Sequence, residues 1–335
     1  MAKSEKDENI VKENFRMRKS PELVRFFELM SALQKTIRWC EVNDARFFAK
    51  ELIEMGKPGT NFTRLKVIAA EDIGLADPTL LKYVWECSDE FEIMLKKYNL
   101  KKSQISDSPE TCAIIDRAVI AAALSNKSRL LAMLTFATLF DIYKNEDFNQ
   151  GLDEYKKQFQ TAIQRQDEKN AAYYAYVVGI FLKSENSLLE IVRQESKTRN
   201  TELIDEWSRE YRRTKKEDKF LILAGIISLL CRELDQHGEY RDHVSEWLSL
   251  PIDEAVIPDR AFDMHTDAGR EKGRGFKHFF DEAATIRNER FPNDWEEQGK
   301  EAYFQAQREG LEESEVIEAI KKKCHDYGGQ EILKF

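Results

Sequence analysis

Cysteine, proline and glycine are scarce in this chain, with five, seven and fourteen among 335 residues. The cysteines are far apart, odd in number and without CxxC spacing, which predicts free or buried thiols in a reducing compartment and argues against a zinc or disulfide framework. The longest apolar run, at 220–231, is too short to span a bilayer, and residues 1–20 hold no apolar signal-peptide core. These absences predict a cytoplasmic protein without a membrane segment.

The sequence also lacks the short motifs of common catalytic sites. It contains no GxxxxGK[ST] phosphate loop, so we expect no ATPase activity, and it has no GxSxG or HExxH motif. Charged residues are 34% of the chain and hydrophobic residues 42%, which is typical of a charged, helix-rich protein. With a net charge of −9, any contact with nucleic acid requires a local basic patch. We predict no catalytic residue and no cofactor.

Apolar residues recur at helical spacing along most of the chain, and no run alternates in the manner of a strand. Residues 111–139 are apolar nearly all round and predict central helices, and further helices are expected at 276–290, 297–308 and 312–324. The expected fold class is all-α, a multi-helix bundle. Changes of composition predict a charged, disordered arm (1–20), a helical core (21–140), a helical insert (141–250), and a Gly/Arg-rich tail with C-terminal helices that pack on the core (251–335).

The segment 64–78 has the sequence RLKVIAAEDIGLADP and combines a helix, a carboxylate pair and a helix stop. Glu71 and Asp72 lie at the C-terminal end of that helix, where the macrodipole disfavours negative charge. Gly74 can adopt a positive φ, and Asp77 begins an Asp-Pro turn into the next helix. The two carboxylates therefore predict a partner, which is a cation, an arginine or backbone N–H groups. The alternative is a plain corner between two helices, held by side-chain caps.

This segment resembles the ASEDIGLADP segment in the C-terminal region of the MgsA/RarA replication-associated recombination ATPases, whose eukaryotic relative is the Werner helicase-interacting protein. Three further motifs are similar to that family in the same order: residues 31–38 (SALQKTIR) to SAxxKSIRGSD, residues 44–56 (DARFFAKELIEMG) to DAALYWLARMLEAG, and residues 109–128 to PE…AVIYLA…PKSN. Residues 256–258 and the Gly/Arg-rich run after them are similar to the family's VPxHLR…GYGxGYxYPHD tail.

The resemblance implies a fold like the collar of a clamp loader, which holds subunits together, typically as tetramers. It implies a non-catalytic oligomerisation or adaptor protein in DNA replication, recombination or repair, with a separate AAA+ ATPase, single-strand-binding protein or DNA as partners. The residues that match the family motifs, here called the corner, are Glu71, Asp72, Gly74, Asp77, Lys127 and Ser128. The resemblance carries no ATP hydrolysis to this chain, because the phosphate loop is missing.

The tail has glycines and cations that suit an anion. Backbone N–H groups at Gly269, Gly273 and Gly275 are uncovered by side chains and can meet a phosphate. The candidate DNA or anion contacts in the tail are Arg270, Lys272, Arg274 and Lys277, and a second basic stretch supplies Arg212 and Arg213. In the alternative interpretation, the glycines permit close packing and the arginines pair with Asp259, Asp263 or Glu282 to tie the tail to the helical core.

The same tail carries side chains that can ligate a metal, and these define a rival function from another class. His278 and Glu282 are four residues apart and share a helix face. With Asp259, Asp263 and His265 they would supply oxygen and nitrogen ligands to a divalent ion. In this hypothesis the chain is a metal-dependent phosphodiesterase or nucleotide hydrolase.

Overall fold

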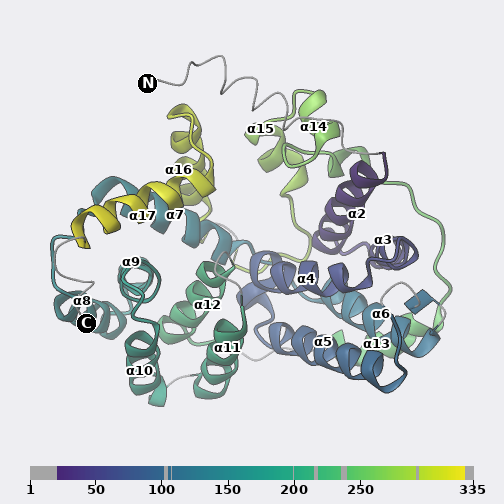
Figure 1. The fold of residues 1–335 in the computed structure, drawn as a ribbon, viewed down its shortest axis with the longest axis horizontal. Coiled ribbons are helices and arrows are strands. Elements are labelled where there is room, and N and C mark those ends of the chain that lie inside the picture. The colour runs from purple at the N-terminus through teal and green to yellow at the C-terminus, as the bar shows by residue number, and fades with distance from the viewer. Residues whose placement is uncertain are drawn as a thin grey trace.

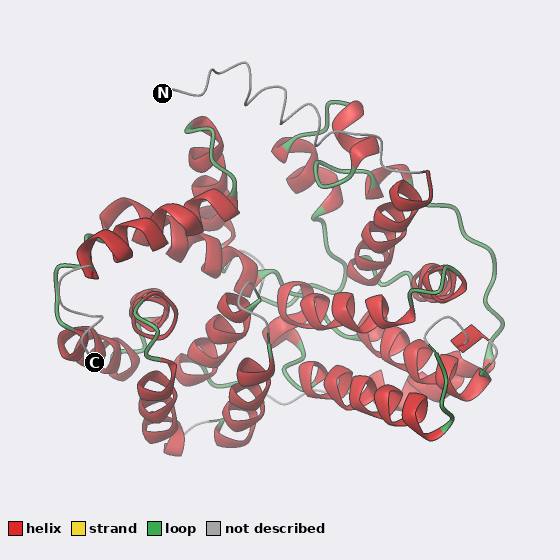
Figure 2. Ribbon diagram, in the orientation of Figure 1, coloured by secondary structure: helices red, strands yellow, loops and turns green. Residues whose placement is uncertain are grey.

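The structure is a computed structural model, and every regular element in its described residues is helical, which confirms the all-α prediction (Figure 2). The one β-type contact found there is an isolated bridge between Lys127 and Glu289. In this part of the chain no helix is both long enough and apolar enough to cross a membrane. The predicted disordered arm, residues 1–20, lies outside the described residues, which are 21–101, 105–106, 108–198, 200–214, 218–234, 240–291 and 294–328.

Local sequence sets the ends of the helices in the first group, on the right of Figure 1. Helices α4 and α6 both begin with proline, whose fixed φ suits the first turn and whose missing N–H is not needed there. Gly56, with φ of 71°, follows the end of α3. The group comprises α2 (Pro21–Arg38), α3 (Val42–Glu54), α4 (Pro58–Ile68), α5 (Leu80–Lys97), α6 (Pro109–Leu124) and α13 (Tyr240–Ser249).

The second group, on the left of Figure 1, is arranged around α7. Helices α9, α12, α16 and α17 all pack against α7. Residue 140, the predicted end of the core, falls inside α7, so the insert helices continue the same helical body. The group comprises α7 (Leu130–Asn145), α8 (Leu152–Gln164), α9 (Glu168–Tyr176), α10 (Glu185–Glu195), α11 (Thr201–Arg213), α12 (Lys219–Cys231), α16 (Glu296–Arg308) and α17 (Glu313–Gly328).

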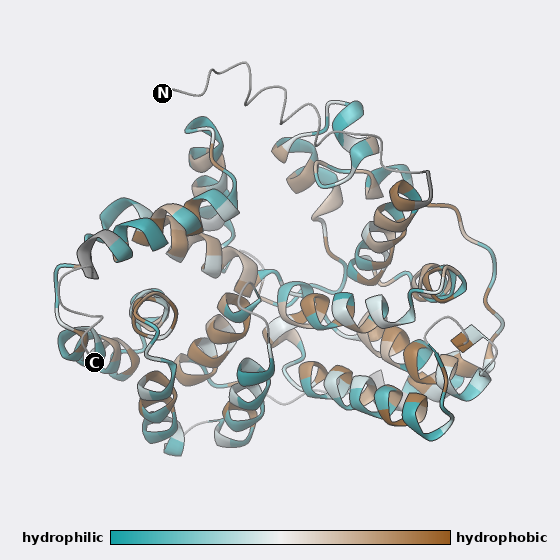
Figure 3. Ribbon diagram, in the orientation of Figure 1, coloured by the Kyte–Doolittle hydropathy of each residue, from teal (hydrophilic) through white to brown (hydrophobic). Residues whose placement is uncertain are grey.

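One hydrophobic core runs through both groups, from Leu29 in α2 to Ile320 in α17. Helices α6 and α7 are buried on nearly all sides, as their apolar sequence predicted. Figure 3 shows the same hydrophobic character along α12. The groups meet where α7 and α12 contact the π-helical turn Ala69–Ile73, and the corner therefore lies at the junction of the molecule.

The predicted helix at 276–290 is shorter than expected. The tail forms α14 (Asp267–Glu271), α15 (Phe276–His278) and a π-helical turn (Phe279–Ala283), and regular helix ends there. Beyond it the backbone pairs with another segment: the Lys127 N–H donates to the Asn288 carbonyl at 3.0 Å, and the Arg290 N–H donates to the Lys127 carbonyl at 2.8 Å. These long-range hydrogen bonds replace the helical ones that the local pattern favoured.

Candidate functional site

The carboxylate pair of the corner lies on the π-helical turn Ala69–Ile73, directly after α4. Asp72 is completely buried. Its Oδ1 accepts a hydrogen bond from Arg38 Nε at 2.7 Å, and its Oδ2 accepts one from Gln34 Nε2 at 2.9 Å. Both donors come from α2, so the partner of this carboxylate is an arginine together with an amide. The pairing satisfies a charge that the end of a helix alone would disfavour.

Glu71 lies beside this pair and is 23% exposed. Its Oε2 accepts a hydrogen bond from Gln34 Nε2 at 3.2 Å. Its Oε1 is 3.8 Å from Arg38 Nη2 and 4.0 Å from Arg129 Nη2. One carboxylate thus faces two guanidinium groups from two different helical segments, and it lowers the repulsion between them.

Lys127 is the most unusual member of the corner, because its side chain is fully buried and no carboxylate of the described residues is hydrogen-bonded to it. Its Nζ donates to the carbonyls of Ala123, at 3.1 Å, and Ser125. These carbonyls belong to the C-terminal end of α6, where the helix dipole favours a cation. Burial lowers the pKa of Lys127, and the carbonyls hold the ammonium in place.

The other corner residues connect α4, α6 and α7. The Ser128 N–H donates to the Asp72 carbonyl at 2.9 Å, and Ser128 Oγ accepts from the Leu130 N–H at 3.1 Å at the start of α7. Asp77 accepts a hydrogen bond from Ser125 Oγ at 3.2 Å. Gly74 has φ of 48°, and a Cβ there would lie 3.0 Å from Leu131 Cδ1, so this position requires glycine. The structure therefore brings all six corner residues together.

Residues 283–290 of the tail, here called the strap, cover the corner. Arg38 Nη1 donates to the Ala283 carbonyl at 2.7 Å, and the Arg287 N–H donates to the Arg38 carbonyl at 3.3 Å. Lys127 pairs with the strap through its backbone, as described above. The strap thus connects α2 to the segment between α6 and α7, and the family-motif residues and the tail form one unit.

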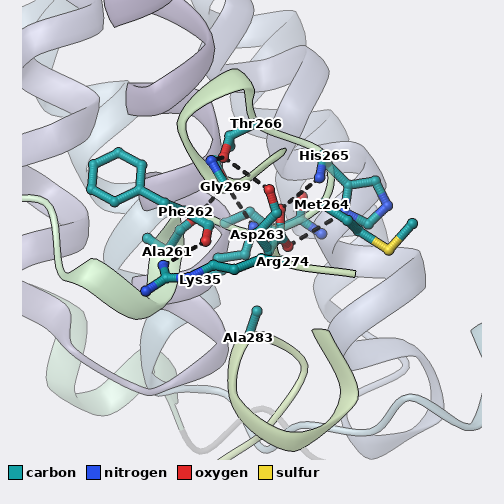
Figure 4. A network of polar contacts seen from close by, with 12 residues as sticks. Lys35, Ala261, Phe262, Asp263, Met264, His265, Thr266, Gly269, Arg274 and Ala283 are labelled. Atoms are coloured by element: carbon teal, nitrogen blue, oxygen red, sulfur yellow. Dashed lines mark hydrogen bonds and ion pairs between the residues drawn. The ribbon is translucent and has the colours of Figure 1, made fainter. Parts of the chain in front are cut away.

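The loop before the strap contains a second buried ion pair (Figure 4). Lys35 Nζ lies 2.9 Å from Asp263 Oδ2, and the two side chains are 6% and 0% exposed. The His265 N–H donates to Asp263 Oδ1 at 3.0 Å, and its ring Nδ1 is 3.3 Å from Oδ2. Burial alone would raise the pKa of Asp263, but the His265 hydrogen bond and the Lys35 charge outweigh burial and hold the pKa well below its ordinary value.

The cations predicted to contact an anion are largely engaged within the chain. Arg274 donates to the Phe262 carbonyl at 2.7 Å, and both Arg274 and Lys272 pair with Asp259. Hydrogen bonds from these two side chains lower the pKa of Asp259 to about 2. Arg270 pairs with Asp267. The alternative interpretation of the sequence, in which the arginines pair with acidic residues to tie the tail to the helical core, included the pairing of Arg274 with Asp259.

Both candidate arginines of the second basic stretch are exposed, but only Arg213 has an ion pair among the described residues. Arg213 lies 2.6 Å from an Asp89 carboxylate oxygen, and its guanidinium covers the Trp85 ring at 4.2 Å. Arg212 is exposed, as is Lys277 in the tail, and no ion pair is found for either among the described residues. Arg213, Arg270 and Lys272 are exposed as well, but each is ion-paired within the chain.

The five candidate metal ligands do not converge. Asp259 is bonded to two cations and Asp263 to Lys35, while His278 and Glu282 face each other at 3.5 Å. Within the described residues, no group of three or more His, Cys, Asp or Glu side chains is arranged to hold a metal ion. The geometry of these residues gives the metal-dependent hydrolase hypothesis no support.

Sequence reasoning missed the donors that α2 supplies to the corner and the tail. Gln34 and Arg38 are four residues apart, and Lys35 and Arg38 are three apart, so these side chains share one side of the helix. Three polar donors at helical spacing within residues 34–38 were the available signal. Arg129, which directly follows the Lys127-Ser128 motif, was missed as well.

The all-helical fold is consistent with the C-terminal region of an AAA+ protein. Residues 40–176 match the family model described as MgsA AAA+ ATPase C terminal, which confirms the resemblance for this part of the chain. The match contains the corner and continues past residue 140, into the segment predicted as an insert; it leaves out α2 and the tail. Searches of curated proteins and of solved structures found no match.

Proposed function

We propose that this protein is a non-catalytic helical assembly module that acts in DNA replication, recombination or repair in the cytoplasm. The observation that carries the proposal is the match of residues 40–176 to the C-terminal region of an AAA+ recombination ATPase family. The corner also supports it, because its charged side chains are bonded to other parts of the same chain. Groups fixed in this way stiffen a scaffold.

In this proposal the chain assembles with copies of itself, by resemblance as a tetramer, and serves a separate AAA+ ATPase or single-strand-binding protein. The strap and the corner would set the relative orientation of the two helix groups, and hence the shape of the surface offered to a partner. The molar mass of the protein in solution decides whether copies associate.

Contact with DNA is the second part of the proposal, and it rests on the exposed cations Arg270, Lys277 and Arg212. The test is fluorescence anisotropy of a forked DNA across a salt series, with the variant Arg270→Glu/Lys277→Glu beside the natural protein. We expect binding that weakens with salt. In the variant, the slope of log K against log salt should be shallower by about one for each phosphate that the protein no longer neutralises.

The matched control for the DNA experiment is the double variant Lys96→Glu/Lys97→Glu, at two exposed cations on α5. It changes the net charge in the same direction, so an equal weakening in the control would assign binding to net charge alone. Absence of binding at low salt would contradict the DNA part and leave a protein-only adaptor.

A further inference from the structure

A pocket of about 240 Å³ opens between the start of α7, the tail and the start of α16. Arg129 lies at the α7 side, Glu289 on the strap and Lys300 on α16. Phe280 and Met133 supply apolar wall. The pocket adjoins the corner, because Arg129 also faces Glu71.

Arg129 carries a buried charge that the described residues do not satisfy. Its side chain is 10% exposed, and its Nε finds no hydrogen-bond partner among the residues that the structure describes. Its one ion pair in the described part of the chain is the 4.0 Å contact with Glu71, and the guanidinium lies 5.1 Å from the centre of the Phe279 ring. A buried, underbonded cation costs free energy, so such a group calls for a ligand that completes its bonds.

The position of Arg129 strengthens this requirement. It is the N-cap residue of α7, a helix of 16 residues. The N-terminal end of a helix carries partial positive charge and favours an anion. The charge of Arg129 and the α7 dipole therefore both attract an anion. The ligand that would satisfy the hydrogen-bond donors of the guanidinium is an oxyanion.

The opposite wall contains carboxylates, and two of the three are neutralised. Asp294 pairs with Arg232 at 2.5 Å, and Glu296 pairs with Lys300. For the Glu289 carboxylate, neither a hydrogen bond nor an ion pair is found among the described residues. Burial, followed by the charge of Glu296, raises the pKa of Glu289, which makes it a good acceptor for an acidic proton. The pocket thus offers a donor at Arg129 and a free acceptor at Glu289.

We propose that this pocket binds the protonated phosphate group of a small phosphate monoester. The phosphate oxygens accept hydrogen bonds from Arg129, and the P–OH group donates to Glu289. The apolar wall at Phe280 and Met133 contacts the organic part of the ligand. Sulfate has the same shape but carries no proton near neutral pH, so its oxygens would repel the Glu289 carboxylate. The pocket should therefore distinguish phosphate from sulfate.

The test is equilibrium dialysis of the full chain with radiolabelled inorganic phosphate near pH 6.5, with unlabelled sulfate or a nucleoside monophosphate as competitor. We expect saturable binding of one phosphate per chain, weak competition by sulfate, and stronger competition by the monophosphate. A preference for inorganic phosphate over the monophosphate would contradict the ester. Absence of saturable binding, or equal competition by sulfate, would overturn the proposal.

Two variants assign the roles. Arg129→Gln should weaken phosphate binding by about tenfold or more, as expected when a charge-assisted hydrogen bond is removed. Glu289→Gln lies at an exposed position, so it should fold, and it should let sulfate compete as well as phosphate does. Lys96→Gln, at an exposed cation of α5 outside the pocket lining, is the control and should bind unchanged. If Glu289→Gln keeps the discrimination against sulfate, the assigned role of Glu289 is wrong.

Discussion

Arg38 Nε lies 2.7 Å from Asp72 Oδ1, and neither side chain is more than 2% exposed. The arginine ends α2 and the aspartate lies on the turn after α4, so this contact joins two segments that are 34 residues apart. Arg38 also donates to the strap through Ala283. A single buried guanidinium therefore connects the first helix, the corner and the tail.

The first prediction concerns this pair. Asp72→Asn removes the main charge that compensates Arg38 and should lower the free energy of unfolding by about 3 kcal/mol, because the buried cation keeps only its 3.8 Å contact with Glu71. Urea unfolding measures the change. The control is Glu301→Gln, which breaks the exposed pair with Arg308 and should cost less than about 1 kcal/mol. Equal effects of the two substitutions would show that the Arg38–Asp72 pair does not stabilise the corner.

The second prediction concerns pH. Because the pKa of Asp263 is lower in the folded chain than its unfolded value of about 3.9, the unfolded chain takes up this proton first as the pH falls. Asp263 therefore contributes stability above about pH 4, and this contribution disappears at lower pH. Asp263→Asn should be less stable at neutral pH, with a smaller decrease of stability between pH 5 and pH 3. The measurement is the urea midpoint at each pH, and parallel curves for the two proteins would contradict the assignment.

The third prediction separates two tail glycines that look alike in the sequence. A Cβ on Gly269 would lie 1.9 Å from the Asp263 carbonyl oxygen, whereas a Cβ on Gly275 would meet nothing within 4 Å. Gly269→Ala should therefore cost about 1 to 3 kcal/mol or more, since backbone must move, and Gly275→Ala should be nearly neutral. Thermal unfolding of the two variants compares them directly. Similar melting temperatures would mean that the loop around Asp263 is not packed as described.

The sequence contained enough to predict helices and a bonded carboxylate pair at the corner. Apolar spacing determines which faces are buried, and charge at the wrong end of a helix requires a partner. The identity of that partner could not be predicted, because Arg38 reaches Asp72 only after α2 and α4 have packed. The prediction of a helix at 276–290 was wrong after Ala283 for a related reason. The apolar pattern there is helical, but the backbone of residues 288–290 pairs with Lys127 instead. The role of Lys127 itself depends on carbonyl groups, which carry no sequence signal.

The most direct test of the proposed function is the molar mass of the natural protein by light scattering after size exclusion, at micromolar concentration. The proposal predicts a mass that is a multiple of the 39.2 kDa chain, with a tetramer expected from the family resemblance. A strictly monomeric protein over the accessible concentration range would contradict the assembly role.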